Sequence, residues 1–104
     1  MTDRELLELA AKAAGIESLW WTKDGNKLFQ RNGGEQKPWN PLQDDGDALR
    51  LAVMLNLVVL SDQTGISTAN GMHQRAKELH GTDPLAATRR AITRAAAEIG
   101  RSMK

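Results

Sequence analysis

The sequence predicts an α+β domain in which three helices pack on a small antiparallel sheet of three to four strands. Two observations indicate this class. Three segments combine helix start signals with apolar residues at helical spacing, and short β-prone runs lie between them. A chain of 104 residues also leaves room for only one core, so residues 1–104 are expected to form a single domain.

The first helix is expected to begin directly after Thr2. Thr2 and Glu5 have the spacing of a capping box, in which hydroxyl and carboxylate satisfy open amide groups at a helix start. Gly15 can supply a left-handed stop. The residues expected on the apolar side are Leu6, Leu7, Leu9, Ala10, Ala13 and Ala14. This pattern predicts an amphipathic helix packed by its leucines.

A β-hairpin is expected next. Residues 19–22 and 27–31 are β-prone and flank Asp24-Gly25, a pair typical of tight hairpin turns. Because alternate residues of a strand face opposite sides, Trp20 and Trp21 are predicted on opposite faces.

Residues 32–41 hold two glycines and two prolines around Trp39. Proline disfavours both helix and central strand, so we expect an ordered but irregular loop. A turn is predicted at Asn32-Gly33-Gly34.

The second helix is expected after the acidic cluster Asp44, Asp45 and Asp47, because carboxylates suit the positive end of a helix dipole. Residues 48–55 are apolar around most of the circumference, which predicts the central, most buried helix of the core. Asn56 is expected to turn the chain into a strand at residues 57–60.

Residues 66–69 indicate another strand. Residues 72–80 fit either a helix or a strand, and their position after a turn favours the strand.

The third helix has strong start signals, with Asp83 at the cap and Pro84 at the first helical position. It is expected to run to about Ile99 and to end at Gly100. Its apolar stripe is predicted to be Leu85, Thr88, Ile92, Ala95, Ala96 and Ile99, with Arg90, Arg94 and Arg101 on the opposite face.

Composition excludes some classes of site. The chain has no cysteine, which excludes disulfides and thiolate chemistry and is consistent with a reducing compartment. The apolar run at residues 51–60 is too short to cross a bilayer, and the amino terminus does not read as a secretory signal, so we expect a soluble intracellular protein with no membrane partner. A net charge of +1 provides no global field for nucleic acid.

Two features are candidates for binding. Arg89, Arg90, Arg94 and Arg101, with Lys104, could hold phosphate or an acidic protein surface, because guanidinium makes two-pronged bonds to such anions. Alternatively, they are the charged outer face of a surface helix. Trp39 is the tryptophan expected to be exposed for stacking or partner contact, and packing is its alternative role.

Catalytic and metal sites are not predicted. Helix capping explains Asp44, Asp45 and Asp47, because the spacing of a calcium loop is missing. His73 and His80 lie seven apart and lack the spacing of a helical zinc site. No nucleophile-elbow motif surrounds a serine. We therefore expect a non-enzymatic protein without a cofactor.

Three segments together resemble a known group of proteins. They are residues 5–15 (ELLELAAKAAG), 39–53 (WNPLQDDGDALRLAV) and 83–92 (DPLAATRRAI). They resemble small, uncharacterised accessory proteins encoded by tailed bacteriophages and prophages. The likeness covers the helical parts but not the hairpin or residues 61–81, and it carries no established active site.

This resemblance implies an accessory protein acting in the host cell cytoplasm by binding. The leading hypothesis is that it antagonises a host process, most simply a defence system, by binding a host protein or sequestering an anionic nucleotide signal. The expected contacts are Trp39, Arg89, Arg90, Arg94 and Arg101, and a homo-oligomer would help to enclose a pocket. The alternatives are a nucleic-acid-binding module using the basic face of the last helix, a small hydrolase or transferase using His73 or His80 with a nearby carboxylate, and a structural or assembly component.

Overall fold

The computed structural model describes residues 1–16, 18–32 and 35–103. The elements follow in the order α1 (Asp3–Ala13), β1 (Leu19–Trp21), β2 (Leu28–Asn32), β3 (Glu35–Pro38), α2 (Asp45–Met54), β4 (Val58–Ser61), β5 (Ile66–Asn70), β6 (Arg75–Leu79) and α3 (Pro84–Ser102). The α+β class is confirmed. The prediction of one sheet is wrong, because the strands form two three-stranded antiparallel sheets, β1-β2-β3 and β4-β5-β6.

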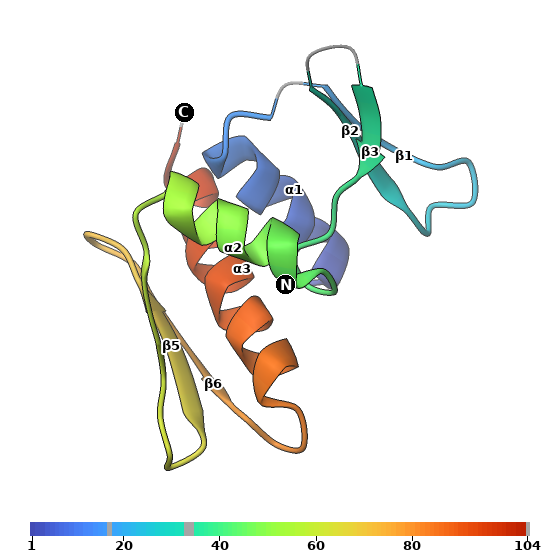
Figure 1. Ribbon diagram of the computed structural model, residues 1–104. Helices are drawn as coiled ribbons and strands as arrows, with labels where there is room; N and C mark the ends of the chain where they lie inside the picture. Colours follow the sequence, from blue (N-terminus) through green and yellow to red (C-terminus); the bar gives the residue numbers. More distant parts are fainter. Residues whose placement is uncertain (17, 33–34, 104) are drawn as a thin grey trace.

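The helices lie between the two sheets (Figure 1). The second sheet, β4-β5-β6, packs against α3, while α1 and α2 contact α3 from other sides. The first sheet, β1-β2-β3, lies on the far side of the helices from the second (Figure 1). Each sheet contains three strands that are consecutive in the chain, as is usual for sequential strands, and α2 lies between the two groups in the sequence.

The local helix signals are confirmed. The hydroxyl of Thr2 accepts the N–H of Glu5 at 3.1 Å, and the Glu5 carboxylate completes the capping box. Asp83 caps α3, with Pro84 as its first residue. Asn56 has a φ of 54°, the left-handed conformation expected of the turn between α2 and β4.

The first hairpin is also confirmed. Gly25 has a φ of 76° in the turn between β1 and β2. The two neighbouring tryptophans face opposite sides as predicted. Trp20 stacks on Phe29 with ring centroids 6.2 Å apart, whereas Trp21 packs against the core with the guanidinium of Arg4 4.5 Å from its ring centroid.

The irregular loop predicted at residues 32–41 is wrong in part. β3 forms within it and pairs with β2, so that Pro38 lies opposite Phe29. Proline is tolerated there because β3 is an edge strand. The turn predicted at Asn32-Gly33-Gly34 includes residues 33 and 34, which lie outside the described residues.

The three strands of the second sheet match the strands expected from the sequence, including the strand favoured within residues 72–80. Val59, Ala69 and Ala76 are neighbours across this sheet on the face toward α3. In the described ranges, no helix has the length and apolarity needed to cross a membrane.

The central helix is α3, so the prediction that α2 occupies this place is wrong. Leu49 and Val53 of α2 are 64% and 68% exposed. In α3, by contrast, the buried residues include Ala91, Ile92, Thr93, Ala95, Ala96 and Ala97. Small side chains let the neighbouring elements approach α3 closely on several sides. The stripe predicted for α3 also included Leu85, which is 62% exposed.

Gly100 does not end α3 as predicted. The helix continues to Ser102, and a Cβ atom at Gly100 would lie 2.0 Å from the carbonyl oxygen of Leu9 in α1. Gly100 therefore permits the close contact between α1 and α3.

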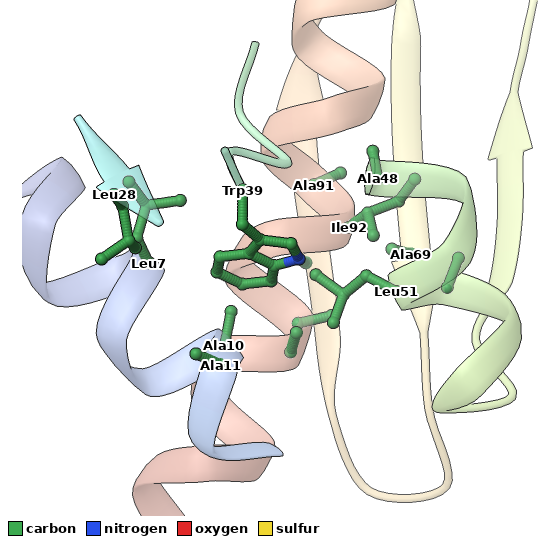
Figure 2. Close-up of a cluster of buried hydrophobic side chains, with 14 residues drawn as sticks. Leu7, Ala10, Ala11, Leu28, Trp39, Ala48, Leu51, Ala69, Ala91 and Ile92 are labelled. Carbon is green, nitrogen blue, oxygen red and sulfur yellow. The ribbon is translucent and has the colours of Figure 1, made fainter. Parts of the chain in front are cut away.

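Trp39 lies in the core, so the expectation of an exposed tryptophan is wrong. Trp39 is 5% exposed, and its backbone N–H donates to the carbonyl of Leu28 at 2.9 Å. Figure 2 shows the indole between Leu28 and Ala10 on one side and Leu51 on the other. This backbone hydrogen bond holds Trp39 at the end of the β2–β3 pairing, and the residue belongs to the same core cluster as Leu28 of the first sheet.

Candidate ligand pocket

The structure separates the predicted contact residues. Arg89 is 17% exposed in its side chain, donates from Nε to the carbonyl of Leu42 at 2.9 Å, and pairs with Asp45 at 2.7 Å. These bonds attach the segment before α2 to α3. Arg89 therefore serves the packing of the helices and does not belong to a continuous arginine surface.

Arg90 and Arg94 join α3 to its neighbours. Arg90 bonds Asp3 of α1 at 3.0 Å and lies 3.8 Å from the carboxylate of Glu78 in β6. Arg94 pairs with the same Glu78. One ionic network thus connects α1, β6 and α3.

Arg101 pairs with Glu98 on its own helix at 3.4 Å. Arg90, Arg94 and Arg101 line, together with Arg75, a pocket of about 470 Å³ that also contains Glu78 and Glu98. The carboxylates neutralise part of the arginine charge there, which weakens the attraction for an anion. Lys104, considered with these arginines, lies outside the described residues.

Trp39 contributes to a different pocket, which we call the hairpin pocket. It has a volume of about 380 Å³ and lies between the carboxyl end of α1, the first sheet and α2. Its lining residues are Ala14, Gly15, Ile16, Ser18, Gln30, Arg31, Lys37, Trp39, Arg50, Leu51 and Met54.

Cations surround the hairpin pocket. Lys37 of β3 lies opposite Gln30 of β2, Arg31 is the next residue along β2, and Arg50 comes from α2. Arg50 pairs with Asp47 at 2.7 Å. Among residues 1–16, 18–32 and 35–103, no carboxylate oxygen lies within 4.0 Å of the side-chain nitrogens of Arg31 or Lys37. The pocket therefore carries positive charge that the described acids only partly compensate.

The rest of the lining is mixed. Ile16 and Met54 provide apolar surface, and Ser18 and Gln30 provide a hydroxyl and an amide. Small-molecule sites commonly combine apolar walls with a few polar groups that orient the ligand. The arrangement suits a small anion that also has an apolar or ring-containing part.

Sequence reasoning missed Arg31, Lys37 and Arg50 as candidate contacts. They come from three elements that converge only through the fold, and their spacing in the chain contains no motif. The polar residues of the hairpin, where strand alternation places Gln30 and Lys37 on one face, are the signal that could have indicated them.

The acidic cluster has structural contacts. Asp44 caps α2 by accepting the N–H of Asp47 at 2.8 Å, which confirms its predicted role. Asp47 is 8% exposed and accepts the N–H of Asn40 at 2.9 Å as well as its bond from Arg50. Within the part of the chain that the structure describes, no group of three histidines or carboxylates converges to hold a metal ion.

His80 takes part in a polar network. Its Nε2 lies 2.9 Å from the hydroxyl of Ser67 and 3.2 Å from that of Ser61. Ser67 is fully buried and also bonds Thr88 of α3 at 2.7 Å. The network connects the second sheet to α3, and the burial of Ser67 keeps its hydroxyl from any substrate. His73, the other histidine considered for catalysis, is exposed outside this network.

Comparisons of the chain with protein families, with curated proteins and with solved structures found no match. Among the described residues, the hairpin pocket with its cationic lining is the feature that best indicates a function.

Proposed function

We propose that this protein is a non-enzymatic binding module that holds a small, nucleotide-like anion in the hairpin pocket. The observation that supports the proposal most is that Arg31, Lys37 and Arg50 line this pocket, with no carboxylate among the described lining residues. Guanidinium and ammonium groups favour phosphate oxygens. The apolar surface of Ile16 and Met54 suits a nucleobase or ribose.

The size of the pocket is consistent with this class of ligand. Its volume of about 380 Å³ lies at the small end of the range of small-molecule sites, about 300–1,000 Å³. Trp39 is 5% exposed, so its ring acts as part of the wall and not as a stacking platform. Recognition then depends on ion pairs between the ligand phosphates and the cationic side chains of the pocket, and on burial of the apolar part of the ligand.

In the cell, we propose that the protein is a phage accessory protein that sequesters an anionic nucleotide signal of a host defence system. The resemblance of the helical segments to phage accessory proteins supports this setting. Sequestration needs binding without turnover and would take place in the host cytoplasm. The version in which it binds a host protein has no comparably defined surface in the described residues.

The direct experiment is a binding assay with named probes. Thermal shift and calorimetry would be measured with ADP-ribose, cyclic adenosine mononucleotides and dinucleotides, and inorganic phosphate. A ligand present at 100 times its Kd stabilises the folded state by about 2.7 kcal/mol. For a domain of this size, that raises Tm by about 10 °C or more. If no nucleotide produces a shift, the proposed ligand class is wrong.

A matched pair of variants locates the site. Lys37→Glu reverses a charge in the hairpin pocket, whereas Lys77→Glu makes the same change at an exposed strand position of the second sheet. We expect Lys37→Glu to abolish nucleotide binding and to remove protection of a phage from a nucleotide-signalling defence, and Lys77→Glu to retain both. Equal binding by the two variants would contradict the assignment of the site.

A second candidate function is nucleic-acid binding at the arginine pocket, favoured by the four arginines that line it. It predicts an affinity that falls steeply as salt rises, and a weaker affinity for Arg75→Gln. Failure to shift DNA or RNA in a gel at low salt would remove this candidate.

A further inference from the structure

The four edge strands of the two sheets differ in how they are protected. β1 is only three residues long, β3 carries Glu35, Lys37 and Pro38, and β6 carries Arg75, Lys77 and Glu78. β4 reads Val-Val-Leu-Ser and has neither a charge nor a proline. Edge strands in soluble proteins are usually kept from pairing by short length, charges or proline. β4 lacks these features.

The outer side of β4 is open among the described residues. β4 pairs with β5, and no backbone hydrogen bond joins residues 58–61 to another element in the described part of the chain. Every second residue of an edge strand directs its N–H and C=O away from the sheet. Val58 and Leu60, on the face away from α3, are 59% and 58% exposed. Unused backbone groups and exposed apolar side chains thus occur on the same strand.

We propose that β4 pairs antiparallel with β4 of a second copy of this chain, which joins the two second sheets into one six-stranded sheet. Identical strands pair antiparallel about a twofold axis, so the contact is self-complementary and closed. With this axis perpendicular to the sheet, the faces directed away from α3 lie on the same side of the joined sheet in both copies. Val58 and Leu60 of the two copies are therefore neighbours. Burial of these residues then favours association.

Charge favours a second copy at this edge in particular. β4 has no charged residue, so two copies meet there without repulsion. At the opposite edge, self-pairing would bring together the Arg75 and Lys77 side chains of two copies, and like charges across a strand pair are destabilising.

The test is the oligomeric state of the whole chain. Sedimentation analysis over a wide range of concentrations should show a reversible dimer, because a four-residue strand forms few hydrogen bonds and the complex should dissociate on dilution. Leu60→Lys should be monomeric throughout. Leu79→Lys is the matched control, because Leu79 is 76% exposed on the edge strand β6, and it should dimerise like the unmodified chain. Circular dichroism would verify that both variants are folded.

The absence of native cysteine permits a second, independent measurement. Single variants Val58→Cys and Leu60→Cys should form disulfide-linked dimers under mild oxidation, at least one of them tenfold faster than Leu79→Cys. A chain that stays monomeric at every concentration, a dimer that survives Leu60→Lys, or equal cross-linking at β4 and β6 would overturn the proposal. Lys37→Glu should leave the dimer intact, so this result is distinguishable from a failure of ligand binding.

Discussion

At Gly100, the backbones of α1 and α3 lie so close together that there is no room for a side chain. Any Cβ there would overlap the carbonyl oxygen of Leu9, a backbone atom that can move only if the helix moves. We expect Gly100→Ala to reduce the free energy of unfolding by more than about 3 kcal/mol through overpacking, measured by urea denaturation. Gly46→Ala in α2 is the control, because its Cβ would meet only flexible side-chain ends. Equal stability of the two variants would contradict the close contact.

The arginines of α3 are predicted to differ in their contributions to stability. Arg89 is largely buried and binds both Leu42 and Asp45, whereas Arg101 is 65% exposed and pairs only with Glu98. We expect Arg89→Ala to cost about 2 kcal/mol, because it leaves the Leu42 carbonyl without its charged donor. Arg101→Ala should change stability by no more than about 0.5 kcal/mol. Equal costs of the two substitutions in chemical denaturation would contradict the structural role of the Arg89 hydrogen bond to Leu42.

Residue-level prediction from the sequence succeeded where the determinants are local. Thr2 with Glu5 and Asp83 with Pro84 act within one helical turn, so their spacing alone indicates their roles. Trp39 and Gly100 were misjudged because their environment comes from distant segments. A tryptophan between two prolines can be a surface contact or a core residue, and only the position of α1 and α2 decides between them.

At the scale of elements, the turn between β4 and β5 should be sensitive to acid. The Asp62 carboxylate accepts bonds from the hydroxyl and N–H of Thr64 and from the N–H of Ile66. The hydroxyl of Thr64 makes the largest contribution to lowering the pKa of Asp62, with the backbone donors and nearby His80 adding to it. A lowered folded-state pKa means that the carboxylate stabilises the fold above its unfolded pKa, about 3.9. This stabilisation is lost as pH falls through the folded value.

We therefore expect Asp62→Ala to lower Tm at neutral pH. The difference in Tm between this variant and the unmodified chain should become smaller below about pH 4. Thermal unfolding from pH 7 down to about pH 2 would measure it. Thr64→Val should raise the pKa of Asp62 toward its ordinary value, seen by NMR titration, because it removes the hydroxyl donor. A Tm difference that does not change with pH would rule out the contribution of the ionised carboxylate.

The helices α2 and α3 show why the apolar content of a helix alone does not predict which helix is central. α2 is rich in large apolar residues, yet Leu49 and Val53 are exposed. α3 carries many arginines, yet its alanines are enclosed because small side chains allow several elements to pack around one axis. The signal was present as the run Ala95-Ala96-Ala97, with Gly100 three residues further on. Close approach is a tertiary property, however, and periodicity does not distinguish a buried alanine from an exposed one.

Over the whole molecule, the two sheets are attached to the helices in different ways. The second sheet packs directly on α3 and is joined to it by the network of Ser67, His80 and Thr88. The first sheet connects to the core mainly through the buried Leu28 and the partly buried Leu19 and Trp21. Regions with few buried contacts open at a lower free energy than the core. The hairpin pocket lies on the less firmly attached side.

This difference predicts the pattern of native-state hydrogen exchange. Amides of β1, β2 and β3 should exchange faster than those of β5 and α3, because the first sheet can open without exposing the alanine-rich centre. Leu28→Ala should accelerate exchange in the first sheet while α3 remains protected, and it should weaken nucleotide binding because β2 and β3 carry Gln30 and Lys37. Phe29→Ala, on the opposite face of β2, is the control. It should leave exchange in α3 as slow as Leu28→Ala does, and it should weaken nucleotide binding less than Leu28→Ala. If Leu28→Ala accelerates exchange equally in all elements, the first sheet does not open independently of the core.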